Sequence, residues 1–328
     1  MSKYIRFGVS AVLLTIIAWR TNWSDVGAKF AHLDWGLWFA AVGVSACIQV
    51  VIAKRWQVFA RELRFQSSLP QYCAYCFIGA YFNLLLPTSV GGDVMRVWYL
   101  NGTSGRKLAA LASVFLERVN GLLVLIAMAC VGVLVTPRPL PWWIHASVWS
   151  IAGASFVGAV GFPTLQRFDI LPLYRRQQLQ TMYDLLRVPN LAVQATLASI
   201  LVQLLGVLGL WCLGLSLGLD IPVGYYCILG PLVSLLTLLP ISVNGMGVRE
   251  VGTVILLAPL GVDADSAKTL AFLWFAVTVA VSLLGGLVYL FGAYPRAQTT
   301  SADQGADDHG SIDRDTDQGR AGQHKQAA

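Results

Sequence analysis

The sequence predicts an all-α polytopic membrane protein, and two observations carry that prediction. Of the 328 residues, 56% are hydrophobic and only 12% are charged, and the mean hydropathy is +0.63. A soluble domain usually carries about twice this charged fraction. The apolar residues also form uncharged runs of the length that a spanning helix needs, about 20 residues. This composition excludes a soluble enzyme, a DNA-binding protein and a disulfide scaffold.

About six of these runs are predicted to be transmembrane helices. They cover residues 4–20, 35–53, 112–136, 142–164, 191–218 and 267–292. The first follows Lys3 and Arg6 as a signal peptide would, but no small-residue cleavage site follows it, so it is predicted to remain as a helix. We expect one transmembrane domain over residues 1–295. The remaining residues, 296–328, lack apolar periodicity and are predicted to be a disordered acidic tail.

Two further runs, 65–92 and 221–248, are long enough to cross the membrane but end in helix-breaking residues. Broken backbone at membrane depth is tolerated only where protein buries it or where it lines a watery cavity. Each run therefore predicts a re-entrant segment that enters the membrane, breaks and returns.

The ends of these two segments resemble each other. Leu-Leu-Pro-Thr-Ser-Val at 85–90 matches Leu-Leu-Pro-Ile-Ser-Val at 238–243, and Arg96 and Arg249 each follow the proline by nine positions. Such self-similarity is a known pointer to transporter sites. Basic residues concentrate in the segments that share the side of the N-terminus, which predicts cytoplasmic termini. Under this topology the two segments enter from opposite faces, as an inverted repeat.

Charges inside a bilayer are costly, so each one calls for a reason. We expect Glu117 to pair with Arg96 or Arg249, and Arg118 to pair with Asp93 or Glu250. One interpretation is a purely structural set of ion pairs. The other is that at least one arginine stays available for an anion, because its planar donors match phosphate oxygens. Glycines before the two helix starts would also expose amides to an anion.

The candidate head-group and cavity residues combine the two breaks with these charges. They are Asn83, Pro87, Ser89, Gly91, Gly92, Asp93, Arg96, Glu117, Arg118, Pro240, Ser242, Asn244, Gly245, Gly247, Arg249 and Glu250. No catalytic constellation, metal site or cofactor is predicted. The Cys73–Cys76 pair has neither a second pair nor a nearby histidine, so it indicates packing rather than metal binding.

The order of these motifs resembles the lysylphosphatidylglycerol synthase transmembrane region, also called the flippase-like domain. The resemblance covers about residues 1–295 and rests on four features: Arg55-Trp56, the run from Asn83 to Arg96, Glu117-Arg118, and the run from Leu239 to Glu250. It implies a polytopic fold that binds and translocates lipids, and the best-understood members carry aminoacylated phosphatidylglycerol between leaflets. Two departures limit the resemblance. Asn120 stands where members often have aspartate, and no acyltransferase domain follows residue 295, so lysyl transfer is not expected.

The sequence thus predicts flippase-like translocation of an anionic or isoprenoid-linked lipid across the bacterial inner membrane. The expected partner is a membrane lipid and not a nucleic acid, and a homo-oligomer or a lipid-synthesising enzyme partner is left open. Two alternatives remain. One is a non-transporting scaffold for a lipid-modifying or glycosyl-transferring partner, and the other is a membrane-embedded enzyme that acts on a lipid phosphate.

Overall fold

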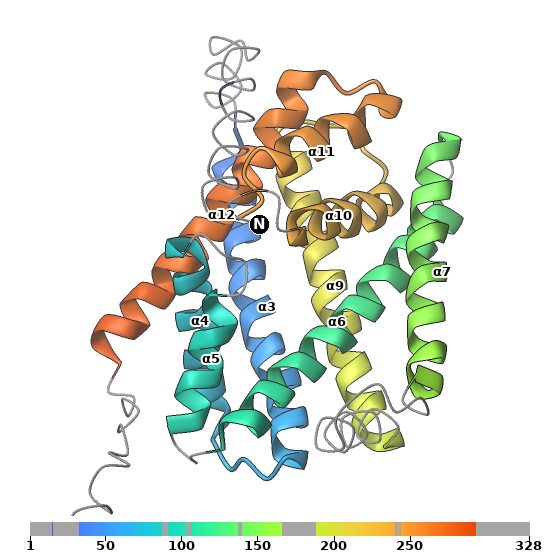
Figure 1. The fold of residues 1–328 in the computed structure, drawn as a ribbon. Helices are drawn as coiled ribbons and strands as arrows, with labels where there is room; N and C mark the ends of the chain where they lie inside the picture. Colours follow the sequence, from blue (N-terminus) through green and yellow to red (C-terminus); the bar gives the residue numbers. More distant parts are fainter. Residues whose placement is uncertain are drawn as a thin grey trace, which may run out of the picture.

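The computed structural model describes residues 15, 33–86, 91–102, 106–136, 140–165, 188–239, 242 and 244–292, and the secondary structure in these residues is helical throughout (Figure 1). The elements are α3 (Trp35–Glu62), α4 (Leu69–Leu85), α5 (Gly91–Gly102), α6 (Lys107–Val135), α7 (Trp142–Leu165), α9 (Pro189–Ser216), α10 (Val223–Leu238), α11 (Val248–Leu257), the 3₁₀ turn η1 (Ala258–Leu260) and α12 (Ala264–Phe291). Within the described residues, α3, α6, α9 and α12 are each long and apolar enough to cross a membrane. The predicted all-α polytopic class is confirmed.

The predicted spans agree with these helices to within about three residues, except that α6 begins at Lys107 rather than at 112 and that α3 ends later than predicted. The boundary predicted at residue 53 is wrong, because α3 continues to Glu62 and carries Arg55 inside the protein. The predicted span ends before Lys54 and Arg55, since charges usually mark the end of a span. Here Arg55 finds a buried carboxylate, which allows the helix to continue. The predicted first span, 4–20, and the acidic tail, 296–328, lie outside the described residues apart from Thr15.

The long helices α3 and α9 lie side by side in opposite directions. The backbone amide of Asp34, just before α3, donates to the carbonyl of Ser216 at the end of α9, at 3.2 Å. The Asp34 carboxylate also caps α3 by accepting from the amide of Gly36 at 2.9 Å. The start of α3 and the end of α9 therefore share one end of the molecule.

Helices α4 and α5 form the first hairpin. The side chain of Asn83 on α4 meets Gly92 on α5, while Tyr75 stacks on Tyr99 with ring centroids 5.2 Å apart. These pairs run in opposite directions along the two helices, so α5 turns back along α4. A β-carbon at Gly92 would lie 2.1 Å from the carbonyl oxygen of Gly79, so only glycine permits this close approach.

Helices α10 and α11 form the second hairpin. The turn at Gly245 touches Thr237 near the end of α10, and the Tyr225 hydroxyl, near its start, donates to the Leu256 carbonyl late in α11. The turn has positive φ at three positions, +50° at Asn244, +74° at Gly245 and +83° at Gly247. Glycine adopts such angles at little steric cost.

The two hairpins enter the helical body from opposite ends and meet inside it. The first follows the end of α3, and the second follows the end of α9, which lies beside the start of α3 (Figure 1). Their breaks are in contact, because the side-chain amide of Asn244 donates to the Leu84 carbonyl at 3.2 Å. This is the arrangement expected of two opposed re-entrant segments. The inverted repeat itself stays a prediction.

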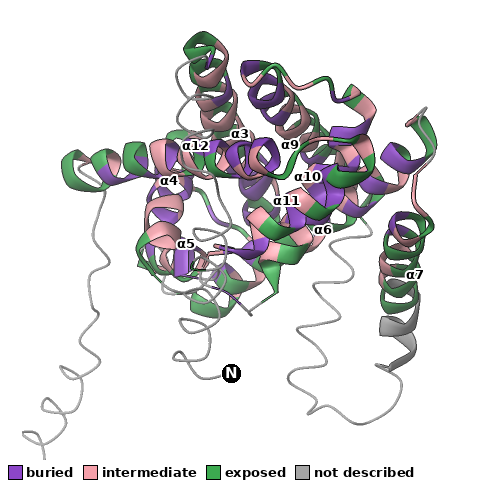
Figure 2. Cartoon of the chain, turned by 90° about the horizontal axis from the view of Figure 1, so that it is seen from above, coloured by how far each residue is buried: buried purple, intermediate pink, exposed green. Residues whose placement is uncertain are grey.

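Buried side chains concentrate around the two hairpins (Figure 2). One hydrophobic cluster surrounds Tyr225 and Tyr226 of α10, and another surrounds Trp56, Tyr72 and Tyr75 beside the first hairpin. The outward faces of the long helices carry exposed apolar side chains instead, as helices that face lipid would. Helix α7 stands at the edge of the molecule and packs against α6.

Candidate functional site

Five charged residues gather beside the first hairpin, and we name them the charge cluster. They are Arg55 of α3, Asp93 and Arg96 of α5, and Glu117 and Arg118 of α6. Glu117 lies at the centre and is only 1% exposed. Because three arginines share two carboxylates, the cluster has a formal charge of +1.

Glu117 accepts hydrogen bonds from two arginines at once. Its Oε1 accepts from Nε of Arg55 at 2.9 Å and also from Nη2 of Arg55. Its Oε2 accepts from Nη1 and Nη2 of Arg96, at 3.2 and 3.3 Å. A carboxylate at this depth is stable because both oxygens are paired and charge-assisted hydrogen bonds are strong.

Asp93 links this centre to the surface. Its oxygens accept from Nε and Nη2 of Arg118 at 3.0 and 2.9 Å, and Oδ1 also accepts from Arg96 at 3.2 Å. The side chain of Arg118 is half exposed, whereas that of Arg96 is buried. The guanidinium of Arg96 also lies 4.3 Å from the ring centroid of Trp56. In this conformation Arg96 therefore contacts two carboxylates and the face of an aromatic ring.

Neutral hydrogen-bonding groups extend the charge cluster to α9. Nη1 of Arg55 donates to the hydroxyl of Ser199 at 2.8 Å, and that hydroxyl donates to Oδ1 of Asn120 at 2.5 Å. The amide of Asn120 in turn donates to Thr196 at 3.3 Å. An aspartate at position 120 could not make this last donation, so the departure from the family pattern fits the local network.

We expect Ser199→Ala to lower the free energy of unfolding by about 1–3 kcal/mol, because it leaves buried polar groups on Arg55 and Asn120 without a partner. Thermal unfolding of the purified protein in detergent measures the change. Ser147→Ala is the matched control, since the Ser147 hydroxyl is exposed and only bonds its own helix at Trp143. Equal stability of the two variants would contradict the network.

At each glycine break, one backbone amide is hydrogen-bonded to a side chain of the protein. The amide of Gly92 donates to Oδ1 of Asn83 at 2.7 Å, and the amide of Gly247 donates to Oε2 of Glu250 at 2.6 Å. The chain thus caps both amides with its own side chains. In this conformation the amides of Gly92 and Gly247 are therefore occupied, and their role in anion binding stays a prediction.

Arg249 stands apart from the charge cluster. Within the part of the chain that the structure describes, it makes no ion pair, and its guanidinium carbon lies 5.5 Å from the ring centroids of both Trp274 and Phe275. It lines a cavity of about 170 Å³ between the two breaks and α12, which we name the Arg249 cavity. The described residues that line it are Ala80, Asn83, Leu84, Thr237, Leu238, Asn244, Arg249, Phe275, Thr278 and Ser282.

The predicted site residues thus divide between two places. Asp93, Arg96, Glu117 and Arg118 form ion pairs, with Glu117 on Arg96 and Arg118 on Asp93, both among the pairings expected. Asn83, Asn244 and Arg249 line the cavity, and Ser242 is buried. Gly91 begins α5. Pro87, Ser89 and Pro240 lie outside the described residues.

Sequence reasoning missed several residues of both places. Arg55 and Ser199 were not placed with Glu117, and Thr278 and Ser282 were not placed with Arg249. One signal was present for the last pair. Residues 275, 278 and 282 of α12 recur at helical spacing, so two hydroxyls share one face of an apolar helix.

These features define an all-helical membrane protein with two opposed helical hairpins, a buried charge cluster and a polar cavity with one arginine. The chain belongs to the family described as the lysylphosphatidylglycerol synthase TM region, whose sequence model matches residues 4–286. No match is found among curated proteins, and none among solved structures.

Proposed function

We propose that this protein translocates an anionic or isoprenoid-linked lipid across the bacterial inner membrane, with Arg249 as the residue that holds the head group. One observation carries the proposal: Arg249 has no carboxylate partner in the described residues and lines a cavity where the two hairpin breaks meet. An unpaired arginine at membrane depth is costly unless it serves a ligand or an ion pathway. Its planar donors suit a phosphate.

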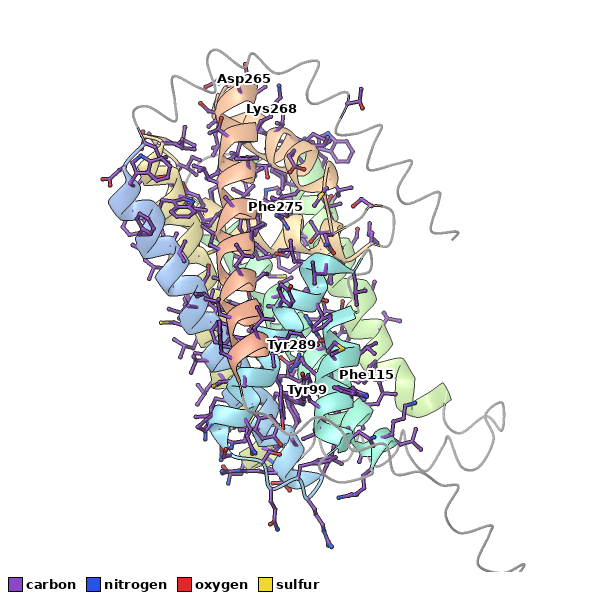
Figure 3. The ribbon with its side chains drawn as sticks, turned by 90° about the vertical axis from the view of Figure 1, so that its left-hand side faces the viewer. Tyr99, Phe115, Asp265, Lys268, Phe275 and Tyr289 are labelled. Carbon is purple, nitrogen blue, oxygen red and sulfur yellow. The ribbon has the colours of Figure 1, made fainter. Side chains whose placement is uncertain are left out.

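The depth of the cavity supports a transport role. Phe275, which lines it, lies between the Asp265–Lys268 end of α12 and Tyr289 near the other end (Figure 3). A site near the middle of a spanning helix, between broken segments that enter from opposite ends, is typical of secondary transporters. Such a site can be reached from either face by small movements of one hairpin.

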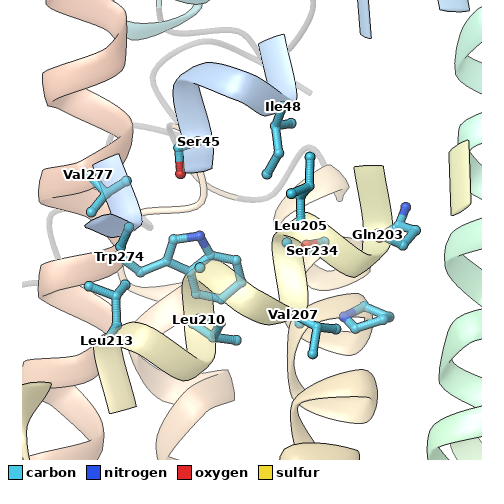
Figure 4. Close-up of a pocket in the computed structure, with 15 residues that line it drawn as sticks. Ser45, Ile48, Gln203, Leu205, Val207, Leu210, Leu213, Ser234, Trp274 and Val277 are labelled. Atoms are coloured by element: carbon cyan, nitrogen blue, oxygen red, sulfur yellow. The ribbon is translucent and has the colours of Figure 1, made fainter. Parts of the chain in front are cut away.

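A second cavity beside the first supports a lipid substrate. It measures about 100 Å³ and lies between α3, α9, α10 and α12, and its lining combines aliphatic side chains and Trp274 with the polar residues Ser45, Gln203 and Ser234 (Figure 4). Trp274 is also one of the two rings beside Arg249. The Trp274 ring therefore contacts both this second cavity and Arg249, so an acyl chain in the second cavity would lie close to a head group held by Arg249.

We further propose that the two termini are cytoplasmic. Arg61 in the last turn of α3 and Arg64 in the turn that follows lie at the same end as Arg106 and Lys107. The opposite end carries Asp263 and Asp265 with Lys268. Basic residues favour the cytoplasmic face.

Cysteine labelling tests this topology. In a background without the six native cysteines, Gln66→Cys is expected to react with an impermeant maleimide only from the cytoplasmic side. Ala264→Cys is expected to react only from the periplasmic side, because it begins α12 at the other end. Labelling of both positions from one side would contradict the proposal that the hairpins enter from opposite faces.

Translocation is tested with the purified full chain in liposomes that contain a phosphatidylglycerol labelled in its acyl chain. We expect outer-leaflet quenching to reach nearly all of the probe in vesicles with protein and about half in empty vesicles, since only translocation brings inner-leaflet lipid to the quencher. A scaffold would leave the two samples equal. An enzyme would convert the probe, which thin-layer chromatography detects.

We propose that the protein is not an enzyme and acts without a cofactor. Arg249, the hydroxyls and the amides of its cavity can hold a phosphate. General acid–base chemistry usually needs a histidine or carboxylate within hydrogen-bond reach of the reacting group. Asp93 and Glu250 are the described carboxylates nearest in sequence to the residues that line the cavity. Asp93 accepts from Arg118, and Glu250 accepts from the Gly247 amide.

A further inference from the structure

Arg118 stands among apolar side chains on the outer face of α6. Its side chain is half exposed. The residues on the same face, at helical spacing before and after it, are also exposed, and all four are apolar: Leu108, Leu111, Phe115 and Leu122. Val94 and Trp98 extend this exposed apolar surface onto α5. Arg118 therefore presents a charge on a surface that otherwise suits lipid chains.

Arg118 lies inside the helix rather than at its end. Between Lys107, the first residue of α6, and Arg118 the helix makes about three turns, or about 16 Å along its axis. Phe115, one turn before Arg118, lies in the half of the molecule away from Asp265 and Lys268 (Figure 3). A charge on a lipid-facing surface at this depth is costly, so it indicates a functional partner.

The charge cluster is a chain of alternating charges with an arginine at each end. Each member pairs with the next, in the order Arg55, Glu117, Arg96, Asp93 and Arg118. The Arg55 end of the chain is buried, whereas the Arg118 end is half exposed. The excess positive charge of the cluster is therefore accessible to an anion at Arg118.

Asp93 uses only part of the donor set of Arg118. Its two oxygens accept from Nε and Nη2 of Arg118, and Nη1 makes no hydrogen bond within the part of the chain that the structure describes. Nη1 and the second N–H of Nη2 can therefore still donate. Two neighbouring N–H donors of a guanidinium match two oxygens of a phosphate.

The start of α5 connects Arg118 with the Arg249 cavity. Asp93, which holds Arg118, directly follows Gly92, and the Gly92 amide donates to Oδ1 of Asn83 at 2.7 Å. Asn83 in turn lines the Arg249 cavity. A group bound at Arg118 would therefore lie beside the break of the first hairpin, on the side that faces lipid.

We propose that Arg118 forms an entry site, where the phosphate of a membrane lipid binds on the outer face of α6 before it reaches the Arg249 cavity. The phosphate neutralises the exposed end of the charge chain, and the lipid chains lie against the apolar side chains around Arg118. Binding at the entry site is independent of translocation. The order in which the lipid meets Arg118 and then Arg249 rests on the proposed function.

Photo-crosslinking of lipid to the purified full chain in liposomes tests the entry site. p-Benzoylphenylalanine replaces Phe115, and the probes are phosphatidylglycerol and diacylglycerol with the same fluorescent acyl chain. We expect phosphatidylglycerol to be captured about tenfold more, since hydrogen bonds to a charged group contribute about 1.5 kcal/mol or more and about 1.4 kcal/mol corresponds to a factor of ten. The matched control carries the same reagent at Phe156, which is exposed on α7, a helix without lysine, arginine, aspartate or glutamate. It should capture both lipids equally.

Three further comparisons assign the preference to Arg118. Arg118→Gln is expected to remove the preference at Phe115 and to leave the protein folded, because Asp93 keeps Arg96 as a partner. If this variant does not fold, the uncharged phosphate methyl ester of phosphatidylglycerol takes its place, and the unmodified Arg118 should capture the ester as weakly as diacylglycerol. Arg249→Gln is expected to keep the preference, because Arg249 belongs to the second hairpin.

Several outcomes would overturn the entry site. Equal capture of the two lipids at Phe115 does so, as does a preference that survives Arg118→Gln or disappears in Arg249→Gln. Crosslinks from Phe115 to residues 4–20 or to a second copy, in place of lipid, show that protein covers this face. Loss of the preference in inorganic phosphate, but not in chloride of the same ionic strength, shows a site for a soluble anion.

The proposed function is judged separately. The expected preference at Phe115 in a protein that moves no lipid in vesicles supports the entry site and contradicts translocation. Translocation without a preference at Phe115 contradicts the entry site alone.

Discussion

Replacing Glu117 with glutamine is expected to destabilise the protein more than any other single change in the charge cluster. Glu117 is paired with Arg55 and Arg96 at the same time, and all three side chains are buried. Glutamine keeps the size of the side chain but removes the negative charge, which leaves the buried Arg55 without a carboxylate and the buried Arg96 with Asp93 alone. Breaking one buried ion pair typically costs about 3–5 kcal/mol. We therefore expect a loss of at least that size.

Membrane yield and thermal unfolding in detergent measure this loss. Glu62→Gln is the matched control, because Glu62 is exposed at the end of α3 and forms no ion pair within the described residues. Surface substitutions of this kind usually change stability by no more than about 0.5 kcal/mol. If Glu117→Gln unfolds at the same temperature as Glu62→Gln, the charge cluster does not stabilise the fold.

The ion pairs of the charge cluster could be predicted from the sequence only in part. The pairings of Glu117 with Arg96 and of Arg118 with Asp93 were among those expected, because charges at membrane depth have few partners to choose from. The partners of Arg55 were not predicted. It follows Lys54 at the end of an apolar run, where a charge normally marks the membrane surface. Only the packing of α3 against α6 and α9 shows that its partners are Glu117 and Ser199.

The surroundings of Arg249 could not be predicted from the sequence. The similarity of residues 85–90 and 238–243 predicted two equivalent arginines, yet the structure gives them different surroundings. Arg96 meets Glu117 because α6 passes beside the first hairpin, whereas Arg249 meets Trp274 and Phe275 because α12 passes beside the second. The neighbours come from helices outside the repeated segments, so a comparison of the segments alone could not distinguish the two.

Replacing Arg249 with glutamine is expected to reduce lipid translocation by about ten- to a hundredfold while the protein stays folded. Hydrogen bonds to a charged group contribute about 1.5–3 kcal/mol, and about 1.4 kcal/mol corresponds to a factor of ten in an equilibrium constant. Stability is expected to change by less than about 1 kcal/mol, because Arg249 has aromatic contacts but no carboxylate partner in the described residues. Arg249→Lys keeps the charge but loses the planar fork, so its rate should fall between the two.

The rate is measured with the acyl-labelled phosphatidylglycerol in liposomes, at equal amounts of reconstituted protein. Arg106→Gln is the matched control, since Arg106 also lies over an aromatic ring, that of Phe65 at 5.3 Å, but at an exposed position outside the Arg249 cavity. Arg106→Gln should transport at the wild-type rate, because nothing that contacts the lipid is removed. A wild-type rate in Arg249→Gln would show that the unpaired guanidinium does not hold the head group. A rate lost together with the folded protein would instead place Arg249 with Glu117 among the residues that stabilise the fold.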